Sequence, residues 1–171
     1  LGGAWVHKAD DSVKKTKMVS MMTTGKTKAT GHQLRSQLKS YFTKNESKID
    51  MLGRGSVPIQ SKRAALLEYR YSVVVESCKY AGYFTEKLVD AFLSKMIPLY
   101  WGAPDVYRYF DPDGMIICKS PGEIIKAVDT LSAEWYDKHW VNILRNFIRA
   151  DFMRCAEDYA YLKYPWIFET N

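Results

Sequence analysis

The sequence predicts an α/β fold, a Rossmann-like and mostly parallel sheet flanked by helices, followed by a long C-terminal helical region. Short apolar runs suited to buried strands alternate along the chain with stretches of helical periodicity. The run at 71–76 is β-branched without alternation, as expected of a strand covered on both faces. Loops rich in glycine, proline and threonine separate these elements. The pattern is typical of βαβ units.

The first elements follow a polar, glycine-containing stretch at 1–15, which we interpret as an extension or connector. The remaining residues, 16–171, are expected to form one domain. An apolar run at 18–22 predicts the first strand. After a loop, apolar side chains at i, i+4, i+7 and i+8 predict a helix over 31–42. A second short strand is expected at 48–52, ahead of two glycines.

The middle of the chain predicts a helix at 61–68 and then the central strand at 71–76. A helix at 85–95 has a buried stripe that includes leucine and phenylalanine one turn apart. The next strand is expected at 97–101. Because proline cannot donate to the ladder, Pro98 fits this strand only at an edge or near its opening.

The C-terminal third predicts a short helix around 105–109 and a strand at 115–118. The segment 120–123 (Ser-Pro-Gly-Glu) offers a capping serine, a proline at the first helical position and a glutamate that completes a capping box. It therefore predicts the start of a helix that continues over 123–131. A long helical region is expected at 135–163.

The charge of the chain is uneven. Residues 1–50 carry the whole net charge of +6, with ten Lys/Arg against four Asp/Glu. Residues 51–171 are neutral overall. This suits a phosphate-bearing partner, either nucleotide or nucleic acid, although a solvated lysine-rich surface explains it equally well. The aromatic stripe of the C-terminal region lies in the neutral part, which favours a core or interdomain contact over a nucleic-acid face. The stripe consists of Trp135, Tyr136, Trp140, Phe147, Phe152, Tyr159 and Tyr161.

The cysteines Cys78, Cys118 and Cys155 form no C-x-x-C pair, and the three histidines do not cluster with them. We therefore expect reduced thiols and neither a zinc site nor a disulfide framework, which favours a cytoplasmic setting. The sequence contains no apolar run long enough for a membrane segment and does not begin with a signal peptide. A Golgi lumenal setting is the alternative if an upstream membrane anchor has been removed.

Two motifs suggest phosphate or metal binding but have simpler explanations. Gly25-Lys26-Thr27 resembles the end of a P-loop, but the glycine required five residues earlier is Ser20. Asp111-Pro112-Asp113 resembles a metal-binding D-x-D pair, yet proline and the following glycine predict a tight turn. No metal site is expected.

The segment Gly82-Tyr83-Phe84-Thr85-Glu86-Lys87 carries the clearest candidate site. It lies beyond the central strand, where ligands bind in open α/β sheets. Thr85 is predicted to cap the next helix, so that the free N–H groups and Lys87 attract an anion, while Glu86 suits a ribose or sugar diol. Arg35, near the start of an earlier helix, is able to form two hydrogen bonds with phosphate oxygens through its guanidinium. A capped helix with solvated charges is the alternative.

The stretch 68–104 resembles the α-1,3/α-1,4-fucosyltransferase family. It has a strand ending near Glu76, a short loop, Tyr-x-Thr-Glu-Lys at 83–87, a helix, and a Pro-x-x-Trp-Gly-Ala-Pro turn at 98–104. The similarity covers most of 17–135. It implies one half of a GT-B architecture, the C-terminal, donor-binding half of an enzyme. Such enzymes transfer fucose from GDP-fucose to a hydroxyl of a glycan acceptor with inversion.

The resemblance also implies roles for single residues. The matches of Arg35 and Lys87 contact the donor phosphates and stabilise leaving-group charge, which makes them the catalytic candidates. Glu86 would accept hydrogen bonds from the ribose hydroxyls, and Tyr83 would line the donor site. The full donor-binding set is Arg35, Glu76, Tyr83, Thr85, Glu86 and Lys87. No cofactor is required beyond GDP-fucose as the donor substrate.

Two features qualify this expectation. Ser77 stands where the family has an asparagine, so one donor contact is missing or replaced. The general base belongs to the family's N-terminal acceptor domain, which we expect upstream of this chain. A related enzyme that uses another nucleotide sugar, or a non-catalytic nucleotide- or carbohydrate-binding module, is the alternative. Nucleic acid is not expected as a partner.

Overall fold

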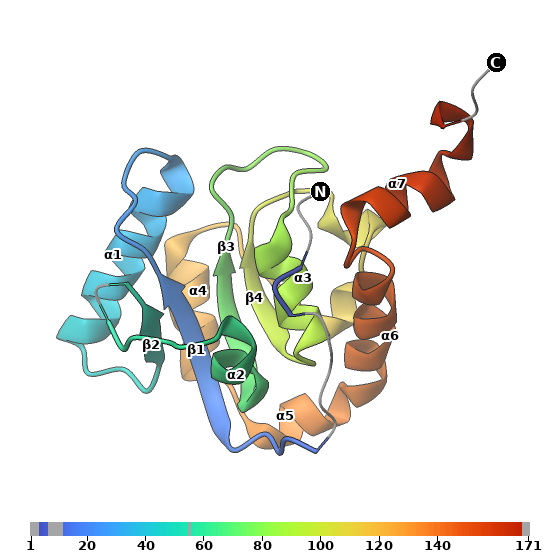
Figure 1. The fold of residues 1–171 in the computed structure, drawn as a ribbon. Coiled ribbons are helices and arrows are strands. Elements are labelled where there is room, and N and C mark those ends of the chain that lie inside the picture. The colour runs from blue at the N-terminus through green and yellow to red at the C-terminus, as the bar shows by residue number, and fades with distance from the viewer. Residues whose placement is uncertain (1–3, 7–11, 55, 169–171) are drawn as a thin grey trace.

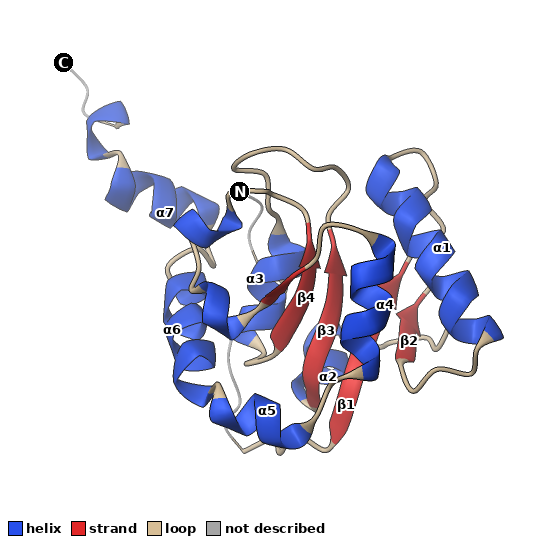
Figure 2. Cartoon of the chain, turned by 180° about the vertical axis from the view of Figure 1, so that it is seen from behind, coloured by secondary structure: helices blue, strands red, loops and turns tan. Residues whose placement is uncertain are grey.

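The computed structural model describes residues 4–6, 12–54 and 56–168, and its centre is a five-stranded sheet in the order β2-β1-β3-β4-β5. All neighbouring strands pair in parallel, and helices cover both faces (Figures 1 and 2). The strands are β1 Lys17–Thr23, β2 Asp50–Gly53, β3 Tyr69–Val75, β4 Ile97–Trp101 and β5 Ile116–Ile117. The predicted α/β class, with its Rossmann-like parallel sheet, is confirmed.

The helices agree with the predicted positions to within a few residues. They are α1 Thr30–Lys44, α2 Lys62–Leu67, α3 Glu86–Leu93, α4 Pro121–Asp129, α5 Ala133–Lys138, α6 Trp140–Asp151 and α7 Ala156–Lys163. Three 3-10 turns, at Val106–Arg108, Pro112–Gly114 and Pro165–Ile167, complete the described elements. As predicted, Ser120 caps α4 by accepting the N–H of Glu123. The Glu123 carboxylate accepts the N–H of Lys119 in return, one residue before the cap.

The sheet separates two apolar layers. One contains buried side chains of α2, α3 and the end of α6, and the other contains those of α1, α4 and α5. Successive residues of β3 enter opposite layers: Val73 and Val75 pack with α1 and α4, and Val74 packs with α3. Burial on both faces is the physical reason for the β-branched run without alternation. Pro98 is tolerated in the internal strand β4 because β5 pairs only from Leu99 onward.

The strand order places a topological switch point between β1 and β3. The chain leaves β1 toward β2 on one side and returns to β3 on the other. As a consequence α1 lies on one face of the sheet, whereas α2 and α3 lie on the opposite face (Figures 1 and 2). In such sheets the crevice beyond the carboxyl ends of the strands at this point is the usual ligand site.

The C-terminal region is helical, as predicted, but it is divided into α5, α6 and α7. His139 ends α5 and precedes α6, and a break at 152–155 separates α6 from α7, which projects away from the sheet (Figure 1). The aromatic stripe is therefore only partly core, since Tyr136 is buried while Phe152 and Tyr161 are mostly exposed. Among the helices described, none combines the length and hydrophobicity needed to cross a membrane.

Part of the predicted connector packs on the domain. Ala4 and Val6 are buried against the α3 layer. The backbone N–H of Ala4 donates to the carbonyl of Arg154 (3.0 Å). The N–H groups of Trp5 and Val6 both donate to Oδ1 of Asp90 on α3 (2.8 and 3.0 Å). This short segment thus lies in a defined position along α3, and the boundary at residue 15 stays a prediction.

Lys15 joins the ends of two helices just before β1. Its Nζ donates to the carbonyls of Leu67, the last residue of α2, and Ser94, the C-cap of α3 (2.8 and 2.5 Å). Burial, with the neighbouring charges of Lys95 and Arg70, lowers the pKa of Lys15 from 10.5 to about 7. A neutral amine keeps two N–H donors, which suffice for both carbonyls.

This shifted pKa predicts that the free energy of unfolding rises with pH. Between pH 7 and 10.5 the folded Lys15 has lost its proton while the unfolded lysine retains it, so unfolding takes up a proton and alkaline pH favours the folded state. We expect the wild-type protein to gain up to about 1.4 kcal/mol per pH unit relative to Lys15→Met. Urea unfolding at pH 7.5 and 9.5 measures this difference. Lys14→Met, at an exposed neighbour, is the control and should follow the wild type; identical pH slopes in all three proteins would contradict the prediction.

Candidate functional site

A pocket with a cavity volume of about 150 Å³ lies at the switch point between β1 and β3. Its charged lining consists of Arg35 from α1, Lys62 from α2, and Glu86 and Lys87 from the first turn of α3. The rest of the lining is mainly apolar and comprises Met22, Leu66, Ser72, Val73, Val74, Val75, Ala91 and Met96. The structure therefore brings together three of the residues predicted from the sequence, Arg35, Glu86 and Lys87.

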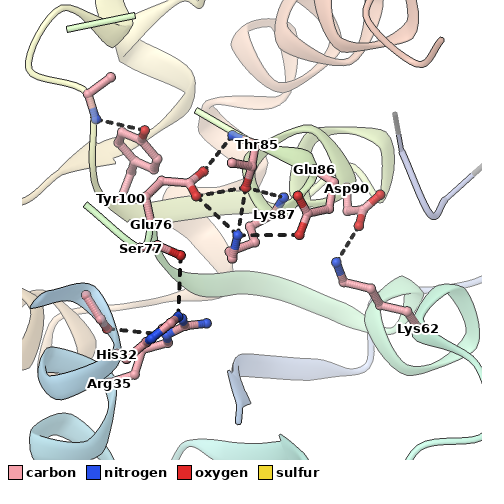
Figure 3. A network of polar contacts seen from close by, with 12 residues as sticks. His32, Arg35, Lys62, Glu76, Ser77, Thr85, Glu86, Lys87, Asp90 and Tyr100 are labelled. Carbon is pink, nitrogen blue, oxygen red and sulfur yellow. Dashed lines mark hydrogen bonds and ion pairs between the residues drawn. The ribbon is translucent and has the colours of Figure 1, made fainter. Parts of the chain in front are cut away.

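Glu76 contacts Thr85 and Lys87 at the start of α3 (Figure 3). It directly follows β3, and its side chain is fully buried. Its Oε1 accepts the N–H of Thr85 and its Oε2 accepts the Thr85 hydroxyl, both at 2.8 Å. Thr85 Oγ1 in turn accepts the N–H of Lys87 (3.4 Å), so the predicted N-cap of α3 is confirmed.

The ammonium of Lys87 is directed by the same pair. Lys87 Nζ donates to Thr85 Oγ1 at 2.8 Å and lies 3.3 Å from Glu76 Oε2 and 3.4 Å from Glu86 Oε1. With about a quarter of its side chain exposed, Lys87 remains accessible from the pocket. Glu76 and Thr85 are not among the residues that line the pocket, but they fix the direction of the lysine that does.

Glu86 is a half-buried carboxylate at the pocket wall. Burial acts to raise its pKa, but the charges of Lys87 and Lys62, with hydrogen bonds from Thr85 and Lys87, outweigh burial and hold the pKa below its usual value. Glu86 is therefore ionised at neutral pH. An ionised carboxylate accepts hydrogen bonds only, which suits a diol.

Arg35 approaches the pocket from α1 and is only 9% exposed. Its Nε donates to the carbonyl of Gly31 (3.4 Å), and the described part of the chain places no carboxylate within ion-pair distance of its guanidinium. Burial lowers the pKa of Arg35, while the charges of Glu76 and Glu86 oppose this shift. An arginine stays protonated in any case, so a nearly buried cation faces the pocket.

The start of α1 packs directly on the loop after β3. The N–H of Gly31 donates to the carbonyl of Ser77 (2.9 Å). A Cβ at Gly31 would lie 1.6 Å from the carbonyl oxygen of Glu76, so only glycine fits this approach. The sequence analysis did not single out this residue, although a glycine in the first turn of a helix signals a close backbone contact.

His32 is a second residue that the sequence analysis missed. Its Nδ1 accepts the N–H of Ala29 (3.2 Å), and its Nε2 lies 3.4 Å from the hydroxyl of Ser77 (Figure 3). Burial and the positive charges of Arg35, Lys26 and Lys87 lower the pKa of His32. These three cations contribute a positive potential at the start of α1, which favours an anion there.

Tyr83 lies outside this pocket. It is half-buried in the loop that precedes α3, and its N–H donates to the carbonyl of Tyr80 (3.2 Å). The loop is fastened to the turn after β4 because the N–H of Gly82, at a φ of +70°, donates to Asp105 Oδ1 (2.7 Å). A role for Tyr83 in donor binding stays a prediction.

The Asp111-Pro112-Asp113 motif forms a turn, as predicted. Asp111 Oδ1 accepts the N–H of Asp113 (3.1 Å), while its Oδ2 accepts from Asn142 and pairs with Arg145 on α6. Oδ1 therefore stabilises the turn itself, and Oδ2 joins the turn to α6. Within the part of the chain that the structure describes, no group of three or more His, Cys, Asp or Glu side chains is arranged to hold a metal ion.

Comparisons with known proteins point to one family. The family model for the C-terminal part of glycosyltransferase family 10 (fucosyltransferase) matches residues 12–139. The α-(1,3)-fucosyltransferase FucT of Helicobacter pylori is 36% identical over 71 residues, which are 42% of this chain and 15% of that protein. A putative fucosyltransferase of Acanthamoeba polyphaga mimivirus is 32% identical over 69 residues, 37% of this chain and 12% of its own length.

Solved structures show the same fold. A crystal structure of an α1,3-fucosyltransferase with GDP-fucose superposes with a TM-score of 0.58 at 22% identity, over 73% of this chain and 38% of the other. A crystal structure of an α1,3-fucosyltransferase with GDP superposes with a TM-score of 0.60 at 20% identity, over 87% of this chain and 46% of the other. This chain thus spans less than half of the proteins that it matches. Because the family model covers most of its length, the chain belongs to glycosyltransferase family 10, the fucosyltransferases, and corresponds to the family's C-terminal part.

Proposed function

We propose that this chain is the donor-binding half of a GT-B fucosyltransferase, which transfers fucose from GDP-fucose to a glycan hydroxyl with inversion. The lining of the pocket carries this proposal. Three cations, Arg35, Lys62 and Lys87, surround it against a single ionised carboxylate, Glu86. The buried carboxylates of Glu76 and Asp90 pair with Lys87 and Lys62 from outside this lining, so the match to a nucleoside diphosphate lies in the kinds of group present and not in a net charge. The phosphates need cations, and the base and ribose need apolar and hydrogen-bonding surface.

In this proposal Arg35 and Lys87 hold the diphosphate from two helices on opposite faces of the sheet. As the bond between fucose and the β-phosphate breaks, the electron pair stays on the departing GDP, and the two cations stabilise its added charge. Glu86 accepts hydrogen bonds from the ribose hydroxyls, and Tyr83 contributes from the adjacent loop. Glu76 and Thr85 support donor binding by positioning Lys87.

The remaining parts of the reaction require groups outside this chain. The general base and the acceptor glycan are assigned to an acceptor domain upstream, so the chain alone should bind the donor without transferring fucose. No metal ion or other cofactor takes part in the proposed mechanism. The cysteines Cys78, Cys118 and Cys155 are all unpaired, which supports a cytoplasmic setting rather than the Golgi lumen.

Calorimetry with GDP, GDP-fucose and a single-stranded oligonucleotide tests the proposal. We expect GDP and GDP-fucose to bind and the oligonucleotide to bind only weakly. Arg35→Ala and Lys87→Ala should each weaken GDP binding by about tenfold or more, because each removes a charge-assisted contact to phosphate. Lys126→Ala, at an exposed site on α4, is the control and should leave binding unchanged.

Two results would count against this function. The first is a failure of GDP to bind the folded wild-type chain. The second is GDP binding that survives both Arg35→Ala and Lys87→Ala unchanged, since the anion would then bind elsewhere. Equal affinity for other GDP-sugars would leave the nucleotide site in place and point to the alternative of a different sugar donor.

A further inference from the structure

Lys62 is the cation of the pocket that no motif singles out. It is the first residue of α2, its side chain is 21% exposed, and its Nζ pairs with Asp90 Oδ2 at 2.5 Å. Figure 3 shows Lys62 directed at Asp90, one helical turn along α3 from Glu86. Lys62 also lines the cavity that Arg35 and Lys87 enter from other helices. It is thus an ammonium beside a cationic pocket, held there by one carboxylate.

Asp90 does not depend on Lys62 alone. Its carboxylate is fully buried, and its Oδ1 accepts two backbone N–H groups, from Trp5 and Val6. A carboxylate that accepts backbone N–H groups has part of its charge stabilised without a counter-ion. If Lys62 turned toward an anion in the pocket, Asp90 would keep these two donors. The cost of sharing the lysine is therefore lower than for an isolated buried ion pair.

We propose that Lys62 is a third cation for the donor's diphosphate, held in position by Asp90 and shared with the phosphates when the donor binds. The inference rests on the proposed function of this pocket. The position of Lys62 in the pocket lining supports it, together with the two backbone N–H donors that keep Asp90 partly stabilised when the lysine turns to the phosphates. In this arrangement Asp90 holds Lys62 in the free protein and competes with the phosphates for it when the donor binds.

The test compares GDP with guanosine, which lacks the phosphates, by calorimetry. Lys62→Gln should weaken GDP binding by about five- to tenfold, as expected for one lost charge-assisted contact, and change guanosine binding by less than about twofold. Lys62→Arg keeps the charge and should restore GDP affinity to within about threefold of wild type. Asp90→Asn should leave GDP affinity unchanged or increase it, because the lysine is released. Lys48→Gln, an exposed residue before β2, is the charge-matched control.

Each alternative outcome overturns the inference. If Lys62→Gln weakens guanosine binding as much as GDP binding, the lysine acts only by stabilising the fold. The same conclusion follows if Asp90→Asn weakens GDP binding as much as Lys62→Gln does. If Lys62→Gln leaves GDP binding unchanged while Arg35→Ala and Lys87→Ala weaken it, the third cation is excluded and the proposed function stands. Failure of all three variants to weaken GDP binding refutes the proposed function itself. Thermal unfolding of each variant confirms that the proteins compared are folded.

Discussion

Replacing Glu76 with alanine should lower the free energy of unfolding by about 3 to 4 kcal/mol, because it removes the partner of several groups at once. The N–H and the hydroxyl of Thr85 both lose their acceptor, and Lys87 loses the carboxylate at 3.3 Å. The buried volume of the side chain is also left empty. Because Lys87 is then no longer directed at the pocket, GDP binding should weaken as well. Urea unfolding and calorimetry on the same variant measure the two effects.

Glu76→Gln separates the charge from the packing. The amide preserves the volume and keeps one oxygen to accept from Thr85, but it removes the charge that faces Lys87, so we expect about half of the stability loss of the alanine variant. Asp129→Ala removes an exposed carboxylate at the end of α4 and should have little effect on stability. Equal stability of Glu76→Ala and Asp129→Ala would show that the buried network is unimportant.

Much of this fold could be predicted from local patterns. The strands at 17–23 and 69–75 are recognisable from apolar runs, and the starts of α3 and α4 from Thr85 and Ser120. Such signals depend on a few neighbouring residues, which is why they succeed. Helical periodicity alone could not locate the break at His139, where one residue ends α5 and precedes α6 without interrupting the apolar pattern.

The candidate site was predictable only in part. Arg35, Glu86 and Lys87 each follow a strand on a helix start, so the rule for open α/β sheets brings them to one edge. The contacts that fix them are non-local: Asp90 binds residues 84 and 85 positions earlier in the chain, and Lys62 reaches across from α2. No spacing rule connects such residues. Glu76 was predicted as a donor-binding residue; the structure shows it fully buried and in contact with Thr85 and Lys87, and its part in donor binding stays a prediction.

Gly31→Ala is expected to be among the most damaging small substitutions in the chain. The added Cβ would lie 1.6 Å from the carbonyl oxygen of Glu76, and backbone cannot yield as a flexible side chain does. The start of α1 must then move away from the loop after β3, which breaks the hydrogen bond from Gly31 to Ser77. We expect a loss of about 3 kcal/mol in the free energy of unfolding. Because Arg35 moves with α1, GDP should also bind about tenfold more weakly.

Gly25→Ala is the matched control for this prediction. Gly25 lies in the loop just before α1, and a Cβ there would meet nothing within 4 Å. The same chemical change should therefore leave both stability and GDP affinity close to wild type. If the two alanine variants behave alike, the close approach of α1 to Glu76 does not constrain the protein. If Gly31→Ala loses stability but binds GDP normally, α1 yields without displacing Arg35, and the guanidinium does not depend on this contact for its position.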